Sequence, residues 1–248
     1  LRLILTLKSK QKQAYDSSYH HKVQSFLYNQ IRGTDFDHLH DFKGEFQPEN
    51  KITPFCFSNI FPYGDMEENS TKKLIVSSPD SSFIKLLHQL IRKKDTARFG
   101  EMEFSITNSY VFDMKIHHPL RFVTMTPVIT RVKKSIYSRY DLDLKHPYEY
   151  IFWRKDYPLE LFLEQTEYNL RKKYLNYYQQ EAKSSLKFTK FVFKKQIAQK
   201  LLVRDTAQTI IGTLWEFWFD ENNELVKFGL DSGFGERNSM GFGFLNQV

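Results

Sequence analysis

The feature that most constrains the fold is an apolar pattern that occurs twice in the chain. Residues 2–7 read RLILTL, and residues 121–127 read RFVTMTP, about 120 residues later. Each segment has the length and composition of a buried β-strand. Since domains usually hold about 100–200 residues, the repeat predicts two small domains, 1–118 and 119–248, which meet near His117-His118-Pro119.

The first half contains strand and helix patterns in the order strand, helix, two strands, helix, strand. Residues 19–31 carry apolar side chains at helical spacing, and Gly33 follows as a helix end. Thr34 and Asp37 have capping-box spacing, which predicts a short helical turn over 35–41. Asp80 can cap a second helix, which has apolar positions between residues 83 and 91 and the basic residues 92–94 at its C-terminal end. The expected strands cover residues 1–7, 55–60, 74–78 and 101–113.

The second half contains a longer helix. Pro158 suits the first turn of a helix that runs to about Tyr178. Strands are expected near 186–195, 198–205 and 207–219, then a short helix over 221–230. Both halves fit the α+β class, as two tandem ferredoxin-like domains on the scaffold that RNA-recognition motifs also use.

Basic residues are concentrated in one stretch of the chain. The sequence has 36 Lys and Arg, 29 Asp and Glu, and a net charge of +7. Residues 171–204 hold ten basic residues and one acid, a net charge of +9, whereas residues 205–248 have a net charge of −5. Within 186–195 the basic residues alternate with apolar and aromatic ones. Because lysines hold phosphates and aromatic rings stack on unpaired bases, the pattern favours a nucleic-acid partner over a solvated lysine-rich face.

Several classes of protein are excluded by composition. A hydrophobic content of 41% argues against intrinsic disorder. Cys56, the single cysteine, rules out a disulfide framework and multi-cysteine metal sites, and it suits a cytoplasmic protein. No apolar run approaches the length of a membrane span. The spacing His38-x-His40 can bind a metal, but no second pair completes a ligand shell, so neither a metal nor another cofactor is expected.

Four glycines lie within eleven residues near the C-terminal end of the sequence. Such a segment lets the main chain adopt positive φ angles or approach a bulky group, and it can present N–H groups to phosphates. It is neither a Walker loop nor a dinucleotide fingerprint, because no Gly-Lys-Ser/Thr follows and it comes after a helix. Turns and bulges use glycine as well. The glycines are Gly233, Gly235, Gly241 and Gly243.

This tail, GFGERNSMGFGF, resembles the glycine-rich signature that ends the CRISPR-associated repeat-RNA processing endoribonucleases, the sixth Cas family of the RAMP superfamily. The segments RLILTL, SFLYNQI, Leu39-His40-Asp41 followed by FCFSNIF, and FVTMTPVIT are similar to that family too. The resemblance spans essentially the whole chain, and its tail is the most specific part. It implies tandem ferredoxin-like domains, cleavage within CRISPR repeat RNA and release of guide RNAs for an interference complex.

The candidate catalytic residues follow the first helix. RNA cleavage without a metal needs a base, an acid and a stabilising cation, and histidine suits the first two roles. The family constellation is a histidine, a helix tyrosine and a lysine; the resemblance assigns His40 to the first and Tyr28 to the second. His38 is an additional imidazole that can act as partner. Lys51 is the nearest candidate for the lysine, although Lys43 or no lysine at all are alternatives.

The resulting prediction is a metal-independent endoribonuclease for CRISPR repeat RNA. Attack of a ribose 2′-OH on the adjacent phosphate would leave a 2′,3′-cyclic phosphate and a 5′-hydroxyl. His40 would act as acid or base with His38, Tyr28 would orient the substrate and Lys51 would stabilise charge. The alternatives are a non-catalytic RAMP-type module that holds the guide RNA in an interference complex, and a metal-dependent nuclease.

Candidate RNA-binding residues lie in the basic stretch and in the tail. The lysines Lys187, Lys190, Lys194 and Lys195 are expected to contact phosphates, together with Arg237 and the four tail glycines. Arg131, Lys133 and Lys134 form an alternative path. Repeat RNA is therefore the expected partner; homodimerisation and contacts with interference-complex subunits stay open, and no membrane partner is expected.

Overall fold

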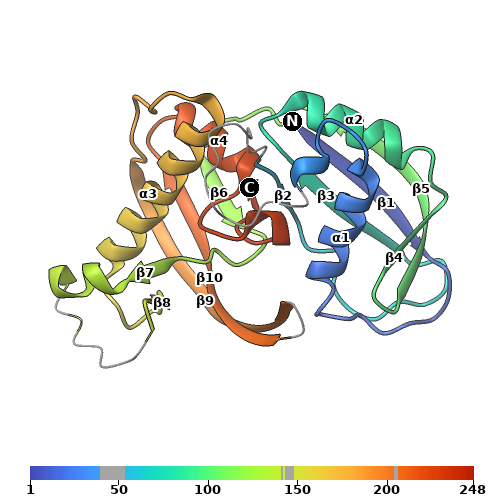
Figure 1. The fold of residues 1–248 in the computed structure, drawn as a ribbon, viewed down its shortest axis with the longest axis horizontal. Coiled ribbons are helices and arrows are strands. Elements are labelled where there is room, and N and C mark those ends of the chain that lie inside the picture. The colour runs from blue at the N-terminus through green and yellow to red at the C-terminus, as the bar shows by residue number, and fades with distance from the viewer. Residues whose placement is uncertain (40–53, 141, 143–147, 204–205) are drawn as a thin grey trace. The chain divides into compact units, whose positions relative to one another are not determined.

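The computed structural model describes residues 1–39, 54–140, 142, 148–203 and 206–248 (Figure 1). The chain divides into two compact units. The first holds residues 1–115 and 239–241, and the second holds residues 116–238 and 242–248. The first unit ends along the chain at Lys115 and the second begins at Ile116. The sequence predicted this boundary three residues later, after residue 118. The short segment 239–241, which groups with the first unit, was not foreseen.

The first unit is a five-stranded antiparallel sheet with two helices. Its strand order is β2-β3-β1-β5-β4, so β1 is central. Leu3, Leu5 and Leu7 alternate along β1 and are fully buried beneath the helices. The elements are β1 (Arg2–Ser9), α1 (His20–Ile31), η1 (Asp37–Leu39), β2 (Cys56–Phe57), β3 (Thr71–Ser77), α2 (Ser81–Ile91), β4 (Thr96–Phe99) and β5 (Met102–Phe112).

Local sequence signals account for the helices of this unit. The buried side of α1 is formed by apolar residues four positions apart, namely Val23, Leu27 and Ile31. Asp80 caps α2 as predicted, since its carboxylate accepts hydrogen bonds from the N–H groups of Ser82 and Phe83 at 2.9 and 3.1 Å. The strand order without β4 is that of a ferredoxin-like domain, and β4 adds an edge hairpin with β5.

The second unit has the same order of elements. Its four-stranded sheet runs β11-β6-β10-β9, all antiparallel, and a separate hairpin joins β7 and β8. The elements are β6 (Arg121–Thr124), β7 (Arg131–Lys133), η2 (Lys134–Tyr140), β8 (Tyr150–Phe152), α3 (Leu159–Tyr178), β9 (Phe188–Val203), β10 (Thr206–Phe219), α4 (Glu224–Ser232), η3 (Asn238–Met240) and β11 (Leu245–Gln247).

One strand prediction in this unit was wrong. The two strands expected at 186–195 and 198–205 form the single 16-residue strand β9. Gln196 and Ile197 continue the pairing with β10 opposite Thr213 and Gly212. No glycine or proline interrupts β9 at this point, so nothing local ends the ladder.

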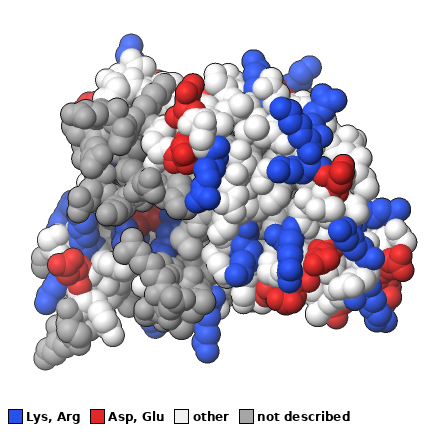
Figure 2. Space-filling view, turned by 45° about the vertical axis from the view of Figure 1, so that its right-hand side comes forward, with Lys and Arg blue, Asp and Glu red and all other residues white. Residues whose placement is uncertain are grey.

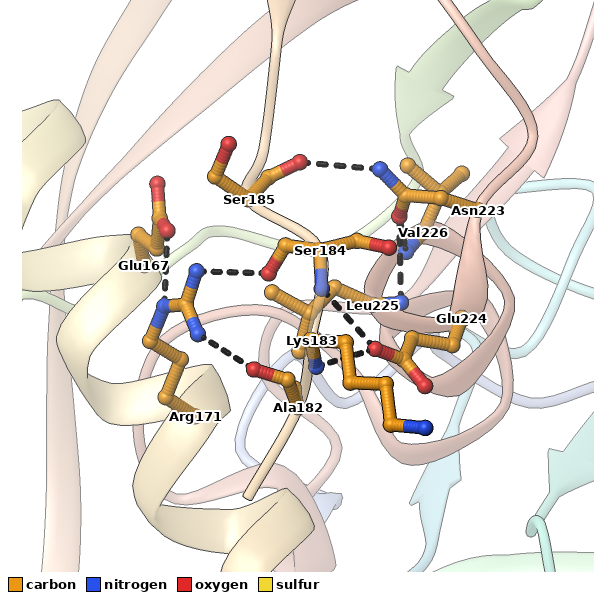
Figure 3. Close-up of polar contacts among 10 residues, drawn as sticks. All are labelled: Glu167, Arg171, Ala182, Lys183, Ser184, Ser185, Asn223, Glu224, Leu225 and Val226. Atoms are coloured by element: carbon orange, nitrogen blue, oxygen red, sulfur yellow. Dashed lines mark hydrogen bonds and ion pairs between the residues drawn. The ribbon is translucent and has the colours of Figure 1, made fainter.

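Arg171 of α3 holds the loop that leads into β9 (Figure 3). Its guanidinium donates hydrogen bonds to the carbonyl oxygens of Ala182 and Ser184 and pairs with Glu167 at 2.8 Å. Although Arg171 counts toward the basic stretch of the sequence, its charge serves the folding of this loop.

The start of α4 holds the same loop from the other side (Figure 3). Asn223 caps α4 through the N–H groups of Leu225 and Val226, and its amide donates to the Ser185 carbonyl at 2.8 Å. The carboxylate of Glu224 accepts from the backbone N–H of Ser184 at 2.9 Å. Among the residues described, no helix combines the length and apolar character needed to cross a membrane.

Candidate functional site

Tyr28 lies near the end of α1, half-buried beside the aromatic core of the first unit. Its ring meets Phe55 edge-on, with centroids 5.8 Å apart. Burial raises the pKa of Tyr28, and hydrogen bonds to Ser239 and Gln24 offset part of the rise. The phenol therefore stays protonated at neutral pH, so it can donate a hydrogen bond but is unsuited to act as a base.

The partner of Tyr28, Ser239, comes from the tip of the glycine-rich tail. The amide of Gln24, one turn before Tyr28, donates to the Ser239 hydroxyl at 3.3 Å. Two residues on, Gly241 has φ +83°, and a Cβ there would lie 2.3 Å from the ring of Phe57. Only glycine fits so close to this buried ring, so the tail tip is built into the unit that carries Tyr28.

His38 lies on the 3-10 turn η1 that follows α1. Its Nδ1 is 2.8 Å from the carbonyl oxygen of Asp35. A carbonyl only accepts hydrogen bonds, so Nδ1 carries the proton of the neutral ring and Nε2 is the basic nitrogen. The predicted caps hold the turn: the Thr34 hydroxyl accepts from the N–H of Phe36, and the Asp37 carboxylate accepts from the N–H of Gly33.

His40 and Lys51, with the alternative Lys43, lie outside the described residues, which stop at Leu39 and resume at Pro54. Leu39 is buried in the core of the first unit, so the residue before His40 is anchored there. The catalytic roles of these residues stay predictions. Within the described parts of the chain, no group of three or more His, Cys, Asp or Glu side chains is placed to hold a metal ion.

The tail glycines are buried, and two of their N–H groups are used internally. Gly235 and Gly243 have positive φ, and a Cβ would lie 2.4 and 1.8 Å from the carbonyl oxygens of Ile129 and Phe234. The N–H of Gly233 donates to Gly229 at 2.8 Å, and that of Gly243 to Pro127 at 2.9 Å. These two groups are not available to a phosphate in this geometry. The structure gives the glycines a packing role, and their contact with RNA stays a prediction.

Lys173 of α3 holds the tail from the inside of the second unit. Its ammonium group donates to the carbonyl oxygens of Gly233 and Gly235 and, at 2.7 Å, to the side-chain oxygen of Asn238. The amide of Asn238 in turn donates to the carbonyls of Phe234 and Phe242. In the sequence Lys173 stands out only as part of the basic stretch, because a lysine that binds carbonyls looks the same there as one that binds solvent.

The predicted tail cation Arg237 also has a place in this unit. It has φ +58°, and its guanidinium donates to the side-chain oxygen of Gln208 at 3.5 Å. The preceding residue, Glu236, forms an ion pair with Arg131, which lies 4.6 Å from the ring centre of Tyr150. Arg131 belongs to the alternative RNA path, and here its charge is compensated by Glu236.

The predicted lysines of β9 gather on one face of the second sheet. Lys190 and Lys194 alternate with Phe191 and Phe193, and the phenylalanines point toward the core. A register shift at Lys194 places Lys195 opposite Leu214, on the same outer face as Lys190. All the predicted lysines are exposed, and Lys187 approaches Glu221 at 4.0 Å.

The outer face also holds residues that sequence reasoning did not single out. Trp218 is half-exposed between Lys190, at 4.8 Å from its ring centre, and Arg121, at 5.3 Å. Glu216 is buried beside them and pairs with Lys194 at 2.5 Å and with Arg121. Lys194 and then Arg121 hold the pKa of Glu216 below its usual value. Around Trp218 the acid Glu216 is therefore outnumbered by four cations, which are Arg121, Lys190, Lys194 and Lys195. This part of the outer face is basic.

Comparison with solved structures agrees with this architecture. A structure titled "An RAMP protein binding different RNA substrates" superimposes with a TM-score of 0.75 at 19% identity, covering 100% of this chain and 99% of the other. The likeness confirms the predicted fold class. The two units define a protein of the α+β class with two ferredoxin-like folds in tandem.

Sequence comparison narrows the class to one family. The family model for the C-terminal part of CRISPR associated protein Cas6 matches residues 113–247, more than half of the chain. "CRISPR-associated endoribonuclease Cas6 2" of Methanocaldococcus jannaschii is 28% identical over the full length of both chains. "CRISPR-associated endoribonuclease Cas6" of Haloferax mediterranei is 24% identical over 100% of this chain and 94% of its own. The chain belongs to the Cas6 family, as the resemblance in its sequence predicted.

Proposed function

We propose that this chain is an endoribonuclease that cleaves CRISPR repeat RNA and releases guide RNAs. Two relatives that match over the whole chain carry the name CRISPR-associated endoribonuclease. The observation that carries the proposal is the placement of Tyr28. Its hydroxyl bonds to the tip of the glycine-rich tail, and its helix leads into the turn that bears His38 and precedes His40.

The proposed reaction is an internal phosphoryl transfer. A base takes the proton of the ribose 2′-OH, the 2′-oxygen bonds to the adjacent phosphorus, and the bond from phosphorus to the 5′-oxygen breaks. An acid gives its proton to that leaving oxygen. The products are a 2′,3′-cyclic phosphate and a 5′-hydroxyl, and the steps need side-chain acid–base groups and no metal ion.

Each candidate residue has a role in this scheme. His40 acts as acid or base with His38 as its partner, and either order of the two is chemically consistent. For His38 the accepting nitrogen is Nε2, because the Asp35 carbonyl holds the proton on Nδ1. Tyr28, protonated at neutral pH, donates a hydrogen bond to the ribose or phosphate. Lys51 stabilises the negative charge that develops on the phosphorane.

The outer face of the second sheet is the proposed path of the RNA backbone. Lys190, Lys194 and Lys195 neutralise phosphates there, with Lys187 and Arg237 extending the path. Trp218 adds a half-exposed ring for an unpaired base. The buried Glu216 forms ion pairs with Arg121 and Lys194 and so orients these two cations on the face.

A non-catalytic RNA-binding module that holds the guide RNA is the second candidate. The basic outer face favours it, because lysines and a tryptophan can bind RNA without any acid–base pair. The solved structure with the same fold, "An RAMP protein binding different RNA substrates", is described in its title as binding RNA. The two candidates make different predictions for purified protein and repeat RNA.

The deciding experiment incubates the protein with the CRISPR repeat RNA encoded beside its gene, in magnesium and in EDTA. We expect the same cleavage rate in both, products that end in a cyclic phosphate, and no cleavage when the ribose at the cut carries no 2′-OH. Binding without cleavage would establish the module instead. Cleavage that disappears in EDTA would establish a metal-dependent nuclease.

A further inference from the structure

A shallow groove lies on the first unit, away from the apolar side of α1. It has a volume of about 360 Å³ and is lined by α1, by β4 and by the residues that follow α2. Helical spacing brings Lys22, Phe26 and Asn29 to one side of α1, where they form one wall. Lys94 and Arg98 form the other wall. Neither the catalytic scheme nor the outer face of the second sheet uses any of these residues.

The lining of the groove is basic. Lys22, Lys94 and Arg98 contribute three cations, and none of the lining residues within the described parts of the chain is acidic. Figure 2 shows basic side chains spread over one face of the molecule with acidic ones among them. Arg98 has two acidic neighbours, Glu101 at 3.8 Å and Glu103 at 3.7 Å. Both pairs are long and exposed, and such pairs exchange readily for another anion.

An aromatic ring gives the groove an apolar contact of fixed position. Phe26 is half-buried and packs edge-on against the fully buried Phe99, with centroids 5.4 Å apart. Gln30 donates from its side chain to the Phe26 carbonyl at 3.1 Å, and the exposed Asn29 adds an amide to the lining. Cations, one aromatic ring and amides are the groups that hold the phosphates and unpaired bases of single-stranded RNA.

We propose that this groove binds a second stretch of the RNA, with Lys22, Lys94 and Arg98 on phosphates and Phe26 against a base or ribose. The inference rests on the proposed function, because the ligand is the same repeat RNA. Asn29 and Tyr28 are successive residues of α1 and point about 100° apart around its axis. RNA held in the groove is therefore held at a fixed distance from Tyr28, on one rigid helix. The groove serves to set which phosphate reaches the candidate catalytic residues.

The test compares the triple variant Lys22→Gln/Lys94→Gln/Arg98→Gln with a control of equal charge change, Lys10→Gln/Lys12→Gln/Lys85→Gln. All three control lysines are exposed on the first unit outside the groove. The probe is fluorescein-labelled repeat RNA with 2′-O-methyl riboses throughout, which cannot react by 2′-OH attack. Fluorescence anisotropy gives the Kd at several salt concentrations, and circular dichroism checks that each variant is folded.

If each of the three cations contributes about −0.7 to the salt slope, the groove variant should show a slope shallower by about 2 and an affinity about 10- to 50-fold weaker at 0.15 M salt. The control should stay within about 2-fold of the unmodified protein. Equal losses in both variants, or an unchanged slope in the groove variant, would overturn the proposal. A groove that binds polyglutamate as tightly as this RNA at the same salt would also overturn it, in favour of an acidic protein partner. Since the probe is uncleavable, a failure of the proposed catalysis leaves this binding test intact.

Discussion

The two units share one topology and place their polar groups differently. In the first unit the described candidate catalytic groups lie near the end of α1 (Tyr28) and on the turn after it (His38), and the buried His20 begins the same helix. In the second unit the polar groups lie on the open face of the sheet, around the buried Glu216. Under the proposed function, the helix end of one unit and the sheet face of the other have separate roles. A helix end fixes a few groups precisely, which suits chemistry, and a sheet face spreads charge, which suits binding.

The largest expected effect is a loss of RNA cleavage caused by a substitution in the first unit alone. His40→Ala should lower the rate of single-turnover cleavage by about 10²–10⁴-fold, because it removes one acid–base group, while the Kd for RNA stays within a few fold. His88→Ala on α2 of the same unit is the matched control. Near-normal cleavage by His40→Ala would end the catalytic assignment of the first unit.

Acid should weaken the first unit before the second. Burial lowers the pKa of His20 from 6.5 to about 4, so between these values the unfolded chain binds a proton that the folded unit does not. Stability therefore falls as the pH drops through this window, by about 3 kcal/mol in total. Glu216 has a lowered pKa, so its contribution is present above the unfolded value of 4.5 and is lost only as the pH falls through the lower folded value.

The measurement is the free energy of unfolding from urea titrations between pH 7 and 4.5. His20→Phe keeps a ring beside Tyr19, on which His20 stacks at 4.6 Å, and should remove most of the pH dependence. His88→Phe, at a half-exposed position, should leave it in place. A pH dependence that survives in His20→Phe would assign it to other groups.

A smaller effect should mark the sheet face of the second unit. Lys190→Gln/Lys195→Gln removes two exposed cations but spares Lys194, the partner of Glu216. Because two phosphates are then no longer neutralised, affinity for repeat RNA should fall about 10-fold at 0.15 M salt and the salt slope by about 1.4. The cleavage rate at saturating protein should change little. Lys155→Gln/Lys227→Gln is the control in the same unit, and equal losses in the two variants would place the RNA elsewhere.

The smallest effect compares two helix caps with the same pattern of hydrogen bonds. Asp80 and Asn223 each accept hydrogen bonds from two N–H groups at the start of their helices. Asp80→Ala should cost about 1 kcal/mol in the free energy of unfolding. Asn223→Ala should cost more, because the amide also donates to Ser185 in the loop before β9. If thermal unfolding showed equal losses, the Ser185 bond would be of no consequence for stability.

Much of the fold could be predicted because its signals are local. The cap at Asp80 and the apolar spacing of α1 each depend on residues a few positions apart, and both helices were predicted at these places in the sequence. The twofold apolar pattern led to the tandem units, and the tail led to the family. The continuous strand β9 was missed because its pairing is decided by β10, which follows it in the sequence.

The candidate site also has a part that could be predicted from the sequence and a part that could not. The sequence by itself determined the residue types that can perform acid–base chemistry, the basic stretch and the glycine-rich tail. Only the tertiary structure decided that Lys173 faces the carbonyls of the tail whereas Lys190 lies on the open sheet face beside Trp218. The tertiary structure also decided that the four tail glycines are buried. The reason is physical: the environment of a lysine or glycine is set by groups that are distant in the chain, 60 residues away for Lys173 and Gly233, and no local pattern records them.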